Sequence, residues 1–111
     1  MIPNTEPFHP LKITGTVRRV LLLHLEAACF FDGHIPGSQP MDLERMQELC
    51  SKVQRGDNQY TARQIGWLDF AASFQIRQLE QLTDSGAAHA WDRAELQALE
   101  IFRERIEMLT L

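Results

Sequence analysis

An apolar run near the start of the chain most constrains the fold. The twelve residues from Val20 to Phe31 contain only two polar side chains, His24 and Glu26, and the turn-rich segment DGHIPG follows. A membrane-spanning helix needs about 20 apolar residues, so this run is too short. A secretory signal needs an apolar segment near the N-terminus and a small-residue cleavage site, whereas the first sixteen residues here are polar and proline-rich. We therefore expect a helix that is surrounded by protein.

The apolar residues of this run fall on more than one face of the expected helix. One stripe consists of Val17, Val20, Leu21, His24, Ala28 and Phe31, and a second, outer stripe of Leu22, Leu25 and Cys29. A helix that is apolar on several faces is enclosed on several sides. Full enclosure is difficult in a chain of 111 residues. We therefore expect the outer stripe to contact another chain.

The rest of the sequence predicts three more helices and no strand. The expected helices cover about 14–31, 41–54, 61–82 and 92–109. Thr61 with Gln64 matches a capping box at the start of the third helix, and Asp92 with Glu95 matches one at the start of the fourth. Trp91 and Leu96 have the spacing of a hydrophobic staple. Residues 1–13 contain three prolines and are expected to form an extended arm.

These features predict an all-α protein. We expect one helical domain over 14–111, in which four helices form a bundle or an orthogonal array without a sheet. The two cysteines lie in apolar helical patterns. Buried thiols of this kind are typical of a reducing compartment. We therefore expect a cytoplasmic protein that does not enter a membrane.

The third expected helix carries an aromatic strip. Trp67, Phe70 and Phe74 recur at helical spacing, and aromatic residues are enriched at protein interfaces. Arg63 and Arg77 would form the rim of such an interface. Together with Leu22, Leu25 and Cys29, this strip is more apolar surface than four short helices need to bury. We therefore predict a small interaction module, meaning a subunit, adaptor or inhibitor, that binds another protein or a second copy of itself.

A nucleic-acid-binding regulator is the alternative. The net charge of −4 argues against a dedicated nucleic-acid coat. The region 45–77 is locally basic, however, and could contact phosphates through Arg45, Lys52, Arg55, Arg63 and Arg77. Gly66 follows Ala62 and Ile65 at a spacing found in helix-turn-helix motifs. A glycine inside a continuous helix costs about 1 kcal/mol relative to alanine, and a close helix crossing would also explain it.

Candidate catalytic and metal-binding groups are sparse. His24 and Asp69 would form an acid–base pair if the first and third helices packed together, but a structural polar contact is the more common role. Cys29, Asp32, His34 and Cys50 are ligand types that zinc uses, but the usual two-residue spacing between paired cysteines is absent. No nucleophile motif or phosphate-binding glycine loop occurs. We therefore predict a protein without enzyme activity, metal or cofactor.

Overall fold

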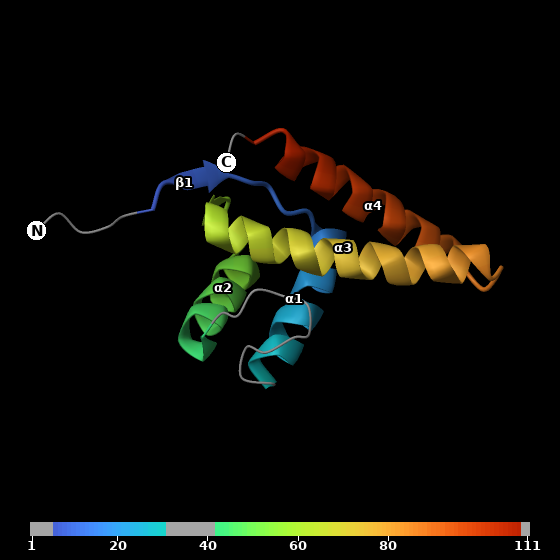
Figure 1. Cartoon of the computed structure of the whole chain (residues 1–111), viewed down its shortest axis with the longest axis horizontal. Helices are drawn as coiled ribbons and strands as arrows, with labels where there is room; N and C mark the ends of the chain where they lie inside the picture. Colours follow the sequence, from blue (N-terminus) through green and yellow to red (C-terminus); the bar gives the residue numbers. More distant parts are fainter. Residues whose placement is uncertain (1–5, 31–41, 110–111) are drawn as a thin grey trace, which may run out of the picture.

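The structure, a computed structural model, describes residues 6–30 and 42–109. The described residues form four helices and two short strands (Figure 1). In chain order these are β1 (Phe8–Pro10), α1 (Gly15–Phe30), α2 (Leu43–Arg55), β2 (Gln59–Thr61), α3 (Ala62–Asp84) and α4 (Ala90–Glu107). The predicted four helices are therefore confirmed, whereas the prediction that the protein has no sheet is wrong.

The longest helix, α3, organises the fold. It extends over 23 residues, and α4 returns along it after a short turn. The helices α1 and α2 pack together on another side of α3 (Figure 1), and α1 also contacts α4. The helices therefore form a crossed array around one core, in which α1 touches all three others.

The two strands join the N-terminal arm to the helical body. They pair antiparallel, with Phe8 opposite Thr61 and Pro10 opposite Gln59. Directly after β1, the alternating residues Leu11 and Ile13 are buried in the core. The arm is extended, as its prolines predict, but it is also part of the fold. A three-residue edge strand tolerates a proline that a longer central strand would not, which is why the proline content misled the prediction.

The sequence predicts the N-cap of α3 correctly and that of α4 incorrectly. At α3 the capping box is confirmed, because Gln64 N donates to Thr61 Oγ1 and Thr61 N donates to Gln64 Oε1. At α4 the prediction is wrong, because the helix begins earlier and His89 is its N-cap. Asp92 accepts a hydrogen bond from His89 N at 2.8 Å. Trp91 stacks on the His89 ring and is 69% exposed, so it forms no staple with Leu96.

Candidate interaction surface

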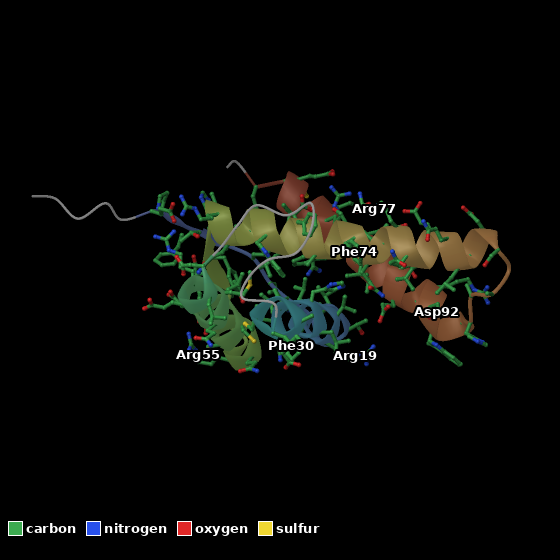
Figure 2. The ribbon with its side chains drawn as sticks, turned by 60° about the horizontal axis from the view of Figure 1, so that its bottom comes forward. Arg19, Phe30, Arg55, Phe74, Arg77 and Asp92 are labelled. Atoms are coloured by element: carbon green, nitrogen blue, oxygen red, sulfur yellow. The ribbon has the colours of Figure 1, made fainter. Side chains whose placement is uncertain are left out.

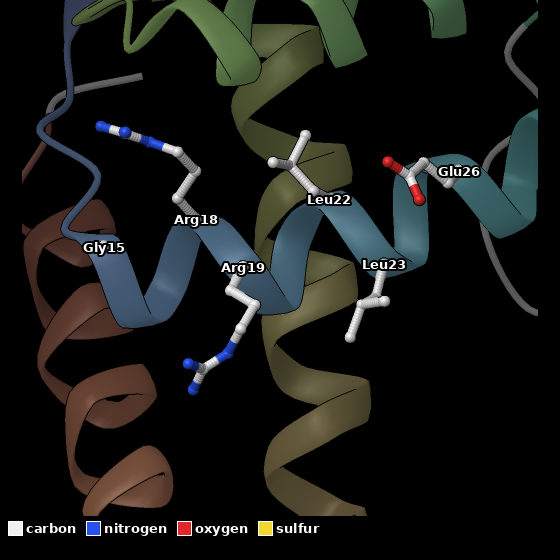
Figure 3. Close-up of a pocket in the computed structure, with 6 residues that line it drawn as sticks. All are labelled: Gly15, Arg18, Arg19, Leu22, Leu23 and Glu26. Carbon is white, nitrogen blue, oxygen red and sulfur yellow. The ribbon is translucent and has the colours of Figure 1, made fainter.

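The solvent-facing side of α1 carries a shallow apolar hollow with charged residues around it. The hollow has a volume of about 350 Å³ and is lined by Gly15, Arg18, Arg19, Leu22, Leu23 and Glu26. We call these six residues the outer α1 face. Figure 3 shows Arg18 and Leu22 pointing to one side of the helix and Arg19 and Leu23 to the other. The hollow lies between these two rows of side chains.

Helical periodicity explains why these residues face outward. The opposite side of α1 is buried and consists of Val17, Val20, Leu21, Leu25 and Ala28. Successive residues of a helix are about 100° apart, so the consecutive Leu21, Leu22 and Leu23 cannot all face the core. Leu21 is fully buried, Leu22 is half-buried and Leu23 is 64% exposed. The leucine run therefore places one large apolar side chain in solvent.

Charged side chains border this exposed leucine. Arg19 lies one turn before Leu23, and Glu26 lies almost one turn after it. The Arg19 side chain is 68% exposed and lies 3.8 Å from Glu95 of α4. Arg18 leans toward α2, where its guanidinium lies close to Gly56. The outer α1 face thus has a basic N-terminal end, an apolar centre and an acidic C-terminal end.

The structure changes the set of α1 residues that the sequence suggested. Leu25 is fully buried, so the expectation that it faces outward is wrong. Leu22 lines the hollow, as expected for an outer residue. Cys29 is half-buried against the core, where burial raises the pKa of its thiol and Glu26 raises it further. Leu23 was missed, although the run of three leucines was a signal for it.

The aromatic strip on α3 does not form one exposed surface. Trp67 is only 4% exposed, so the expectation that it faces a partner is wrong. Phe70 is half-buried, and Phe74 is 37% exposed with its ring edge-on to His24 of α1. Arg63 and Arg77 are exposed, and Figure 2 shows Arg77 one turn beyond Phe74. Phe74 therefore lies beside α1, although neither Phe74 nor His24 lines the hollow.

The basic residues of 45–77 are not gathered into one patch. Lys52 is 8% exposed, and its Nζ lies 4.8 Å from the Phe8 ring centre and 4.7 Å from that of Tyr60. It also donates to Gln64 Oε1, and burial lowers its pKa. Lys52 is therefore a core residue, and the expectation that it contacts phosphates is wrong.

Two of the exposed arginines of this region are paired with carboxylates. Arg45 lies 3.5 Å from Asp42, and Arg55 donates to Asp57 at 2.9 Å. Arg55 on α2 and Arg77 on α3 lie at opposite edges of the molecule in Figure 2. A phosphate backbone is bound by cations that line one continuous surface. Lys52 is buried, and Arg45 and Arg55 are each paired with a carboxylate, so these three residues are not free cations.

The suggested acid–base pair is not formed. His24 Nε2 lies 3.3 Å from Gln75 Oε1, whereas Asp69 accepts a hydrogen bond from Arg103 Nε at 2.9 Å. Gln75 also donates to Glu95, which links α1, α3 and α4 through polar side chains. In the described part of the chain, no three His, Cys, Asp or Glu side chains are grouped as metal ligands would be. Asp32 and His34 lie outside the described residues.

Comparisons of the chain with family models, with curated proteins and with solved structures found no match. None of the helices in the described ranges is both long enough and apolar enough to cross a lipid bilayer.

Proposed function

We propose that this protein acts by binding a protein through the outer α1 face. One observation carries the proposal. Leu23 is 64% exposed and lines a 350 Å³ hollow whose two ends carry opposite charges. Single exposed apolar residues are common on protein surfaces. Here the leucine has a half-buried apolar neighbour, Leu22, and charged residues around it.

The chemistry of the face suits a protein ligand. An apolar centre with a polar rim is the usual anatomy of a protein interface. Complete burial of a leucine side chain contributes about 1.5–3 kcal/mol, so Leu22 and Leu23 would supply the attraction. Arg19 and Glu26 would fix the direction of the ligand, because charges at an interface act mainly on specificity.

Phe74 enlarges the proposed surface. It is 37% exposed and contacts His24, which places it at the junction of α1 and α3. Aromatic side chains bury large areas and often dominate binding energies. We therefore expect Phe74 to contact the same ligand as Leu23, at the edge of the interface. Arg77 would then lie near the rim.

The test compares two variants in which glutamate replaces an exposed apolar residue. Leu23→Glu changes the outer α1 face, and Ile101→Glu changes the exposed side of α4, where Ile101 is 43% exposed. Both tagged variants and the wild type are used for affinity capture from the native cell, with circular dichroism as the check on folding. We expect Leu23→Glu to lose the bound protein and Ile101→Glu to retain it. Equal retention by both variants would contradict the proposal.

A further inference from the structure

We propose that the outer α1 face binds the same face of a second copy of this protein, with the two α1 helices antiparallel. This rests on the proposed function and names the partner. The reason is a symmetry in the order of the residues. Arg19 lies three residues before Leu22, and Glu26 lies three residues after Leu23. The face is therefore nearly symmetric about the midpoint of the two leucines, with opposite charges at its ends.

A two-fold axis through that midpoint makes the face complementary to itself. Leu22 and Leu23 point to opposite sides of α1 (Figure 3), so the axis brings Leu22 beside Leu22 of the other copy and Leu23 beside Leu23. It also places Arg19 against Glu26 of the second copy, twice. A two-fold interface requires one patch to be complementary to itself, and this patch meets the requirement in its charges and in an apolar centre where like leucines meet.

The charges select the antiparallel arrangement. In a parallel pair, Arg19 would face Arg19 and Glu26 would face Glu26, and like charges at an interface are unfavourable. The antiparallel pair replaces these repulsions by two attractions. Arg19 can take part, because its side chain is 68% exposed and its contact with Glu95 is long, at 3.8 Å.

The pairing covers a short part of α1. The paired length from Arg19 to Glu26 is only about 10 Å along the helix, so we expect association in the micromolar range.

Charge exchange between two variants tests the arrangement. Arg19→Glu gives a face with two acidic ends, and Glu26→Arg gives one with two basic ends. Neither should pair with itself, whereas a mixture of the two restores both attractions in a heterodimer. The double variant R19E/E26R restores them within one chain. Sedimentation velocity over about 1–300 µM measures each protein and the equimolar mixture, and circular dichroism verifies the fold.

We expect a wild-type dimer, a loss of at least about tenfold in affinity for each single variant, and recovery in the mixture and in the double variant. Glu95→Gln is the control, because it removes the internal contact of Arg19 and should leave the dimer intact. A wild type that stays monomeric at every concentration would overturn the inference. Weakened single variants without recovery in the mixture would overturn the antiparallel order.

Failure of this inference is distinguishable from failure of the proposed function. If the wild type is monomeric but Leu23→Glu still loses a different bound protein, the face is an interface and the second copy is not its partner. If Leu23→Glu changes neither self-association nor capture of any protein, both proposals are wrong.

Discussion

Gln75 donates a hydrogen bond to Glu95 across 3.3 Å and thereby joins α3 to α4. The same side chain lies 3.3 Å from His24 of α1, and Glu95 lies 3.8 Å from Arg19. These contacts connect the three helices through half-buried polar groups and end at the outer α1 face. They hold α1 at a fixed position relative to the α3–α4 pair.

Removal of the Gln75 side-chain amide should weaken the packing of α1 against α3 and α4. Gln75→Ala deletes the contacts with both His24 and Glu95, and a typical net hydrogen bond contributes about 1 kcal/mol. We expect a loss of about 1–2 kcal/mol in the free energy of unfolding, measured by urea denaturation. Gln78→Ala, at an exposed position of the same helix, is the control and should change little. A similar loss in both variants would show that the effect is one of helix propensity.

Asp69 and Arg103 should behave as a structural pair. Their side chains are 34% and 36% exposed and meet at 2.9 Å, so solvent screens their attraction. We expect a coupling energy of about 0.5–1 kcal/mol in a double-mutant cycle with Asp69→Asn and Arg103→Gln. Additive single effects would mean that the ion pair contributes nothing, despite its short distance.

Alanine substitution at two glycines should change the free energy of unfolding in opposite directions. Gly66 is exposed inside α3, and a Cβ there would meet nothing within 4 Å. The close helix crossing that could explain this glycine is therefore not present among the described residues. Gly66→Ala should raise the free energy of unfolding by about 0.5–1 kcal/mol.

Gly56 is the matched case, because it ends α2 with φ +77° and a Cβ would lie 3.2 Å from Arg18 Nη2. Gly56→Ala should therefore destabilise the protein by about 1 kcal/mol or more. Thermal melts of both variants give the signs directly. A destabilised Gly66→Ala would indicate that the face at Gly66 is covered by protein.

Tyr60 should make the fold sensitive to alkaline pH. Its hydroxyl donates to the carbonyl oxygen of Asp57 at 2.8 Å, and burial, with a further contribution from Asp57, raises its pKa from 10 to about 12. The folded state holds this proton more tightly than the unfolded state does. The stabilising contribution is therefore complete below pH 10 and is lost as the pH rises toward 12.

Denaturant titrations between pH 9 and 12 should show a smaller fall in stability for Tyr60→Phe than for the wild type. The ring that contacts Lys52 is retained in this variant, and the titration of Lys52 is common to both proteins. Parallel curves would mean that Tyr60 does not control the alkaline transition.

The arm should contribute strongly to stability. Leu11 is 3% exposed, and its backbone N donates to the carbonyl oxygen of Asn58 at 2.9 Å. Leu11→Ala leaves a cavity and should cost about 2–4 kcal/mol. Lys12→Ala, at the exposed position beside it, should cost little. If calorimetry finds the two melting temperatures equal, the arm does not stabilise the fold.

Most of the fold follows from local signals in the sequence. The apolar spacings of 14–31 and 61–82 predict α1 and α3, because amphipathic periodicity survives in a small array. The capping box at Thr61 is predicted because both of its hydrogen bonds are local. The pairing of β1 with β2 is not predicted, because it joins residues about 50 positions apart. A three-residue strand has no periodicity to detect it.

The candidate surface is less predictable than the fold. A helical wheel shows that the three leucines of 21–23 diverge, but not which direction the other helices leave open. That direction depends on how α1 crosses α2 and α3, so the sequence pattern places Leu25 on the outer stripe and does not single out Leu23. The partner of His24 likewise depends on the register between α1 and α3. Gln75, six residues beyond Asp69, reaches it instead.

Concentration-dependent NMR shifts test the central claim most directly. Backbone and methyl spectra of the full chain would be compared at about 20 µM and 500 µM. We predict that the shift changes concentrate on Arg19, Leu22, Leu23 and Glu26, with smaller changes at Phe74. Changes confined to the exposed side of α4, around Ile101 and Met108, or no changes at all, would contradict self-association through the outer α1 face.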